Sequence, residues 1–162
     1  MARRDAAFIR LADDHLAQAI LRDPAEAQDA THDALVQAWS KWETLRDQAR
    51  FEAWFDRILV NTCRNRLRRT RRTATDISVE VALASGDHTV HTEDRDVIGA
   101  AISGLSPDHQ VVVALRYYRD LTIPDIAVRL GVPEGTVRSR LHYALKRLHD
   151  AIEPAGTEGM VR

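Results

Sequence analysis

The sequence predicts an all-α protein made of two small helical domains joined by an acidic, flexible linker. Apolar residues recur at helical spacing in both halves of the chain. Only 7 Gly and 5 Pro interrupt the 162 residues, which favours helices with few turns. Residues 57–72 hold seven arginines and no acid, whereas residues 73–98 hold six acids and one base. We therefore expect a domain over 1–72, a linker over 73–92, a second domain over 93–153 and a disordered tail over 154–162.

The first domain is predicted to contain three helices. Apolar spacing indicates the first over Phe8–Leu21, and Asp23-Pro24 breaks that pattern. Pro24 suits the first turn of a second helix, which is predicted over Ala25–Trp42 with Trp39 and Trp42 on its apolar face. A third helix is expected over Arg50–Arg71. Its inward-facing residues are Phe51, Trp54, Phe55, Ile58, Leu59 and Thr62.

The second domain carries clear signals for where helices start and stop. Ser106 suits the N-cap of a helix whose apolar face is predicted to run to Tyr118. Thr122 can cap the next short helix, and Asp125 three residues later completes a variant of the capping box. Gly131 is expected to end that helix, and a tight connection leads to the last one. The apolar stripe predicted for the last helix comprises Val137, Leu141, Ala144, Leu145 and Leu148.

Two short helices joined by a turn with glycine, the second of them basic, are typical of a helix-turn-helix. Residues 135–149 include four Lys or Arg and no acid. Arginine suits guanine because its planar guanidinium matches two acceptors in the major groove, and small hydroxyl residues near the helix start can donate to phosphate. A basic face that is merely solvated is the alternative, and the preceding helix, glycine and turn argue against it.

Bulk properties exclude several other classes of protein. A net charge of −1 excludes a chain that is basic throughout. No apolar run approaches the roughly 20 residues of a membrane span, and the charged start is unlike a signal peptide, so we expect a cytoplasmic protein. Cys63 is the single cysteine, and although Arg64 beside it could lower its pKa, no partner base is identified. We expect no catalytic residue, no metal and no cofactor, because no metal-ligand spacing, nucleophile elbow or phosphate loop is present.

The second half carries a resemblance to a known family. The stretch from Leu105-Ser106-Pro107 through LTIPDIAVRLGVPEGTVRSRLHYALKRL closely resembles the C-terminal promoter-binding domain of the extracytoplasmic-function (ECF) sigma factors. In that family this domain reads the −35 promoter element. The residues that the resemblance implies for −35 DNA binding are Thr136, Arg138, Ser139, Arg140, His142 and Lys146.

The first half carries two further resemblances to the same family. AEAQDATHDALVQAW resembles its polymerase-binding helix, which implies that Asp29, Asp33 and Gln37 contact core RNA polymerase, although an ordinary amphipathic helix would also show them. FEAWFDRILVNTCRNRLRR resembles the helix that melts and reads the −10 element. The residues implied for −10 DNA binding are Asn61, Arg64, Asn65, Arg68 and Arg69. Among the departures from the family pattern, the first predicted helix is shorter than usual and Gln28 stands where the family usually has glutamate.

The resemblance implies a sigma factor, not an enzyme, that binds core RNA polymerase, duplex DNA at −35 and single-stranded DNA at −10. An anti-sigma factor is a typical partner in the family, and neither membrane insertion nor a small-molecule substrate is expected. The acidic linker would enter the polymerase active-site channel or serve as a plain solvated linker. The alternative function is a stand-alone helix-turn-helix regulator that binds operator DNA. The helix with Phe51, Trp54 and Asn61 and its arginine-rich end argues against that alternative.

Overall fold

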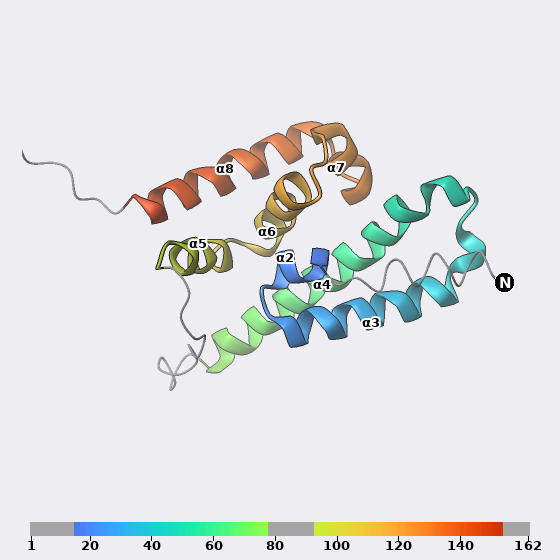
Figure 1. Cartoon of the computed structure of the whole chain (residues 1–162), viewed down its shortest axis with the longest axis horizontal. Coiled ribbons are helices and arrows are strands. Elements are labelled where there is room, and N and C mark those ends of the chain that lie inside the picture. Colours follow the sequence, from blue (N-terminus) through green and yellow to red (C-terminus); the bar gives the residue numbers. More distant parts are fainter. Residues whose placement is uncertain (1–14, 78–92, 154–162) are drawn as a thin grey trace, which may run out of the picture.

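The computed structural model describes residues 15–77 and 93–153, and these residues form helices and turns with no strand among them. The N-terminal part has α2 (His15–Leu21), α3 (Pro24–Ser40) and α4 (Phe51–Ile77). The C-terminal part has α5 (Glu93–Ser103), α6 (Pro107–Val113), the π-helical η3 (Ala114–Tyr118), α7 (Ile123–Leu130) and α8 (Glu134–Ile152). Figure 1 shows α3 and α4 as a long pair below the C-terminal helices. The predicted all-α fold is confirmed.

The pair α3 and α4 is built on small side chains. Asp23 caps α3 as its carboxylate accepts from the backbone N–H groups of Ala25 and Glu26, at 2.9 and 3.1 Å. Four fully buried alanines then form one stripe along α3, and small residues let two helices approach closely. The alanines are Ala27, Ala30, Ala34 and Ala38, and the buried residues of α4 include Phe55, Leu59 and Cys63. The 3₁₀ turns η1 (Trp42–Thr44) and η2 (Gln48–Arg50) connect the pair.

The caps predicted for the C-terminal helices are present. The hydroxyl of Ser106 accepts from the N–H of His109 at 3.4 Å at the start of α6. Thr122 and Asp125 form a capping box at the start of α7. Gly131 ends α7 in the left-handed conformation at φ 65°, which glycine adopts without a steric penalty. The turn signals in the sequence therefore located these helix ends correctly.

Several predicted boundaries and buried positions differ in the structure. Helix α4 continues to Ile77, so it extends into the segment predicted as linker. Tyr118 is 49% exposed because the π-helical turn η3 changes the register of the side chains that follow Val113. Leu145 is 41% exposed because it lies one position beyond the buried Ala144, and Trp39 is 47% exposed on α3. Residues 8–14 of the first predicted helix, 78–92 of the linker and the tail at 154–162 lie outside the described residues.

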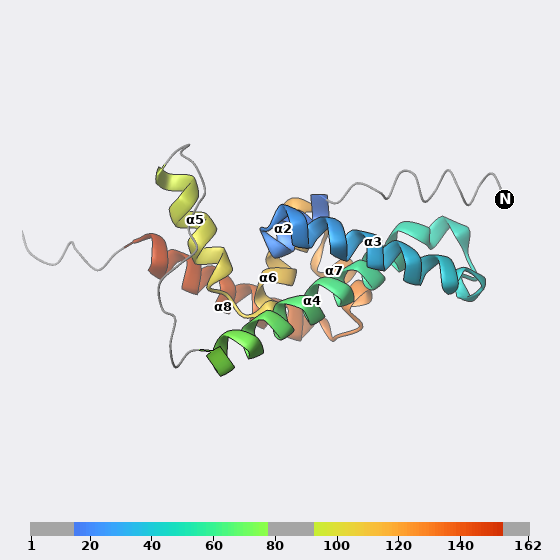
Figure 2. The same ribbon diagram turned by 90° about the horizontal axis from the view of Figure 1, so that it is seen from below.

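The two halves of the chain pack against each other in the structure. Helices α6 and α7 contact α4, and η3 contacts α2. Figure 2 shows these C-terminal elements along the length of α4. The buried side chains form a cluster that continues from one half to the other. It includes Leu16, Ile20, Phe55 and Leu59 from the first half and Val112, Leu115, Ile126 and Val137 from the second.

The left-handed conformation of Gly131 generates a prediction about stability. Gly131→Ala should lower the free energy of unfolding by about 1–2 kcal/mol, because a Cβ is unfavourable at this φ and would lie 3.3 Å from the Arg57 guanidinium. Gly135→Ala is the matched control, because a Cβ added at this position of α8 would have no other atom within 4 Å. Urea unfolding followed by circular dichroism measures both variants. Equal stability of the two variants would contradict the assignment.

Candidate nucleic-acid interface

Helices α7 and α8 form the predicted helix-turn-helix. The turn between them runs from Gly131 to Pro133, and α8 begins at Glu134. Val137, Leu141 and Ala144 are buried and seat α8 on the other C-terminal helices. Because these positions fall on one face, the opposite face of α8 points to solvent. That arrangement is what a recognition helix needs in order to enter a major groove.

The outward face of α8 carries most of the residues predicted to read −35 DNA. Arg138, Ser139, His142 and Lys146 are exposed, and Thr136 is half-buried. Nη2 of Arg138 donates to the carboxylate of Glu134, one turn earlier, at 3.1 Å. Because this ion pair is exposed, a phosphate could replace Glu134 as the partner of Arg138 at little cost in free energy. Because these side chains belong to one helix, they can enter a major groove together.

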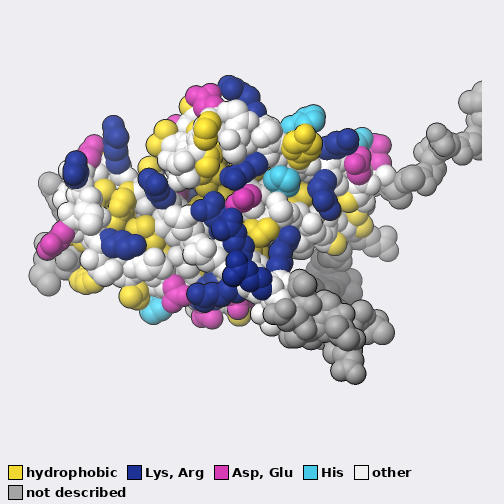
Figure 3. All heavy atoms as spheres, turned by 180° about the vertical axis from the view of Figure 1, so that it is seen from behind, with side chains coloured by type: hydrophobic (Ala, Val, Ile, Leu, Met, Phe, Trp, Pro, Cys, Tyr) yellow, Lys and Arg dark blue, Asp and Glu magenta, His cyan; other side chains and the backbone are white. Residues whose placement is uncertain are grey.

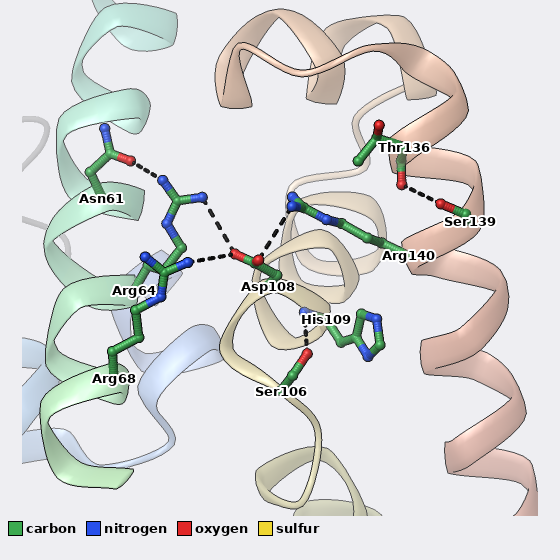
Figure 4. A network of polar contacts seen from close by, with 9 residues as sticks. All are labelled: Asn61, Arg64, Arg68, Ser106, Asp108, His109, Thr136, Ser139 and Arg140. Carbon is green, nitrogen blue, oxygen red and sulfur yellow. Dashed lines mark hydrogen bonds and ion pairs between the residues drawn. The ribbon is translucent and has the colours of Figure 1, made fainter. Parts of the chain in front are cut away.

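Arg140 lies differently from the other predicted −35 residues. Its side chain is half-buried, and its Nη2 donates to the carboxylate of Asp108 at 3.2 Å (Figure 4). It therefore points toward the start of α6 rather than away from the domain. The structure places Arg140 at the edge of the outward face of α8, where the carboxylate of Asp108 holds it.

Tyr143 is a residue of the outward face that the sequence-based prediction missed. It is 58% exposed, and its ring packs edge-on against His142 with centroids 5.5 Å apart. An exposed aromatic ring on a recognition helix offers an apolar surface to thymine methyl groups or bases. The apolar stripe of α8 could have predicted that Tyr143 is exposed, since residue 143 lies on the opposite side of a helix from residue 141.

The predicted −10 residues lie along the second half of α4. The Oδ1 of Asn61 accepts from Nη2 of Arg64 at 2.8 Å. Arg64 and Arg68 also face Asp108, at 3.4 and 3.6 Å (Figure 4). Asn65 and Arg69 are exposed. Figure 3 shows a band of Lys and Arg side chains over this part of α4, which is a suitable surface for phosphates.

The predicted polymerase contacts lie on α3, and only one of the three is fully separate from α4. Asp29 is exposed. Asp33 bonds Nη2 of Arg66 at 2.6 Å, and this hydrogen bond raises the pKa of the Arg66 guanidinium. Nε2 of Gln37 donates to the hydroxyl of Thr62 at 3.3 Å. Asp33 and Gln37 therefore also hold α3 to α4.

The described residues offer no metal cluster. Among residues 15–77 and 93–153, no group of three or more His, Cys, Asp or Glu side chains could hold a metal ion. Within the same ranges, the helices are too short or too polar to cross a membrane.

Burial raises the pKa of the Cys63 thiol to about 12, which corrects the expectation that Arg64 beside it could lower that pKa. The thiol is turned into the core, so desolvation outweighs the nearby charge.

Comparison with known proteins identifies both halves. Residues 14–73 match the family model of sigma-70 region 2, and residues 101–150 match that of sigma-70, region 4. The chain is 35% identical to the ECF RNA polymerase sigma factor SigL of Mycobacterium tuberculosis, over 96% of this chain and 94% of the relative. The chain belongs to the ECF group of the sigma-70 family. It is also 31% identical to the RNA polymerase sigma-E factor of Streptomyces coelicolor, over 90% of this chain and 84% of that protein.

Solved sigma factor structures share the fold. The sigma factor RpoE of Bartonella quintana, solved in complex with the anti-sigma factor NepR, aligns with a TM-score of 0.68 at 23% identity, over 91% of this chain and 92% of RpoE. CnrH, solved with the cytosolic domain of CnrY, aligns with a TM-score of 0.57 at 22% identity, over 91% of this chain and 81% of CnrH. In this ECF sigma factor, region 2 covers α2 to α4 and region 4 covers α6 to α8.

The burial of Cys63 predicts an unreactive thiol. With a pKa of about 12, about one thiol in a thousand is ionised at pH 9, and the native fold also blocks access. Labelling with a disulfide reagent at pH 9 should be at least about a hundredfold slower in the native protein than in urea. A Cys63→Ala variant with Ser40→Cys supplies an exposed thiol as the control. Equal labelling rates in native Cys63 and native Ser40→Cys would show that Cys63 is accessible.

Proposed function

We propose that this ECF sigma factor directs core RNA polymerase to specific promoters, through a duplex-binding surface on α8 and a single-strand-binding surface on α4. The observation that carries the proposal is that one chain presents both a helix-turn-helix with an exposed polar face and an arginine-rich helix beside Asn61. Each surface lies in the half that matches the corresponding sigma-70 region. The relatives are RNA polymerase sigma factors by name.

At the −35 element, α8 would lie in the major groove. Arg138, Ser139, His142 and Lys146 are exposed and would contact bases and phosphates, and Thr136 lies near the helix start, where backbone N–H groups also meet phosphate. Arg140 would join them once it leaves Asp108. Its guanidinium could then pair with guanine.

At the −10 element, α4 would hold the opened strand. Asn61 has an amide that can bond the edge of a base, and its position is exposed. Arg64, Arg68 and Arg69 would follow the phosphates, with Asn65 beside them. Binding of this kind depends strongly on salt concentration, because each arginine that meets a phosphate releases counterions.

Contact with core polymerase is proposed for the outer surface of α3. Asp29 is exposed there, and Val36 and Trp39 add exposed apolar surface on the same helix. Asp33 and Gln37 would contribute the parts of their side chains that α4 leaves accessible. An anti-sigma factor is proposed as a further partner, since RpoE and CnrH were solved in complex with such a factor or with a domain of CnrY.

Binding to core RNA polymerase tests the proposal directly. The purified chain and core polymerase lacking any sigma factor should co-elute from gel filtration as a complex. Asp29→Arg should weaken that complex because it reverses a charge on the proposed contact surface, whereas Gln48→Ala on η2 should not. A well-folded chain that fails to bind, beside a control sigma factor that binds, would favour the stand-alone regulator.

Promoter opening provides a separate prediction for Asn61. Asn61→Ala should leave the fold and polymerase binding intact and slow promoter opening by about fivefold, as expected for one lost base contact of roughly 1 kcal/mol. Permanganate footprinting of the −10 region measures the opening. A footprint that develops at the wild-type rate would remove Asn61 from the base-binding residues.

A further inference from the structure

A hollow lies where the last turns of α4 continue past the start of α3 (Figures 1 and 2). The two helices are antiparallel, because Glu26 near the start of α3 bonds Arg66, whereas Gln37 near its end bonds Thr62. Since α4 continues to Ile77, its turns after Arg66 extend beyond α3. The hollow is lined by Glu26, Arg66, Arg69, Thr70, Thr73 and Ala74.

The size of the hollow suits a small ligand. Its volume is about 530 Å³, within the roughly 300–1,000 Å³ that small-molecule sites occupy. All of its lining residues belong to α3 and α4. The hollow therefore lies within region 2 and does not involve the contact between the two halves of the chain.

The two threonines of the hollow have already used their hydroxyl protons. The hydroxyl of Thr70 donates to the carbonyl of Arg66, and that of Thr73 donates to the carbonyl of Arg69, both at 3.1 Å. What remains for a ligand is the methyl group of each threonine and the lone pairs of its oxygen, which can only accept. With the methyl group of Ala74, these side chains provide apolar surface and hydrogen-bond acceptors together.

The charged residues of the hollow differ in how far they are engaged. Arg66 donates to Oε2 of Glu26 and to Asp33, at 2.9 and 2.6 Å, so its charge is already matched. Oε1 of Glu26 is left to accept from a ligand. Arg69 is exposed, and its guanidinium meets no acid within residues 15–77 and 93–153. The hollow thus has one cation available for an anionic group.

Arg69 also connects the hollow with the proposed −10 surface. Asn65, Arg69 and Thr73 follow one another at intervals of four residues, which places them along one side of α4. Asn65 belongs to the proposed −10 residues, whereas Thr73 lines the hollow. The band of Lys and Arg side chains in Figure 3 lies over the same part of α4. A nucleic-acid strand that follows this band reaches the hollow at Arg69.

We propose that the hollow is a nucleotide-binding site, in which the base lies against Ala74 and the two threonines and the phosphate binds Arg69. Apolar walls beside a few hydrogen-bonding groups are what an unstacked base requires, and arginine pairs well with phosphate. Oε1 of Glu26 and the threonine oxygens accept from an amino group on the base. A phosphate ion alone would use Arg69 and leave these acceptors and methyl groups without a partner.

The hollow is distinct from the base contact proposed for Asn61. Thr73 lies twelve positions after Asn61 in the sequence, which is about 18 Å along a helix. The nucleotide comes either from the promoter strand or from free solution, because both present the same base and phosphate. The promoter source rests on the proposed function, whereas nucleotide binding by the hollow does not.

Titration of the full chain with deoxynucleoside monophosphates, followed by ¹H–¹⁵N NMR, tests the site without DNA or polymerase. The amide signals of Thr70 and Thr73 should shift on addition of dAMP or dCMP. These two nucleotides should bind about fivefold more tightly than dTMP, which has no amino group on its base, as expected for one hydrogen bond. Inorganic phosphate should bind more weakly than either. Phosphate that binds as tightly as dAMP would reject a role for the base.

Three variants test the assigned residues. Arg69→Gln should weaken dAMP binding by about three- to fivefold, the range expected for a screened charge pair. Arg72→Gln is the matched control, because it removes an exposed charge from the same helix outside the hollow. Thr70→Trp fills the hollow and should abolish binding. Circular dichroism melting checks the fold of each variant, and Thr73→Trp replaces Thr70→Trp if that variant does not fold.

Promoter DNA with a single abasic site distinguishes the two sources of the nucleotide. The abasic site is moved one position at a time across the −10 element and its flanks, and binding of the polymerase holoenzyme is measured. If the strand supplies the base, one position should weaken binding of the wild type but not of Thr70→Trp. If dAMP binds and no such position exists, the ligand is a free nucleotide.

The proposal is overturned if no monophosphate binds and no abasic position depends on the hollow. Equal affinities of Arg69→Gln and Arg72→Gln for dAMP would also overturn it. Co-elution with core polymerase separates these results from a failure of the proposed function. A chain that binds dAMP but not core polymerase would keep the nucleotide site and reject the sigma function.

Discussion

The arrangement of this protein depends on the close packing of α3 against α4. The fully buried alanines of α3 let α4 approach, and Phe55, Leu59 and Cys63 fill the contact. Arg66 then bonds both Glu26 and Asp33 across the pair. Because α4 is fixed in this way, its other face presents a stiff row of polar side chains over many turns. The proposed region 2 surface for DNA and the contact with region 4 both use that row.

Use of one helix face for two purposes has an electrostatic consequence. Arginines bind carboxylates as well as phosphates. A chain with a basic helix and a nearby acid can therefore pair its arginines with its own carboxylates. In this sigma factor, Asp56 and Asp108 meet basic side chains across the domain boundary. The apolar cluster that continues from Phe55 and Leu59 to Leu115 and Ile126 supports the same closed arrangement. The charges give the contact its register, and the apolar surface gives it area.

Local chemistry made the helix ends and the helix-turn-helix predictable. Asp23, Ser106 and Thr122 act as N-caps and Gly131 as the stop, because these signals depend on only a few neighbouring residues. Burial was less predictable where local geometry departs from the ideal helix. The π-helical turn η3 turned Tyr118 outward, and one helical position separates the exposed Leu145 from the buried Ala144.

The sequence by itself determined the helical class, the helix-turn-helix and the family, because periodicity, caps and motifs are local properties that one chain displays in order. The tertiary structure alone decided which arginines are engaged. Asp56 meets Arg119 and Arg129 across more than sixty positions, and Asp108 meets Arg64 across forty-four. Nothing in the spacing of these residues marks them as partners. Ion pairs of this kind depend on how whole domains dock, and docking is decided by shape and buried area that no short stretch of sequence contains.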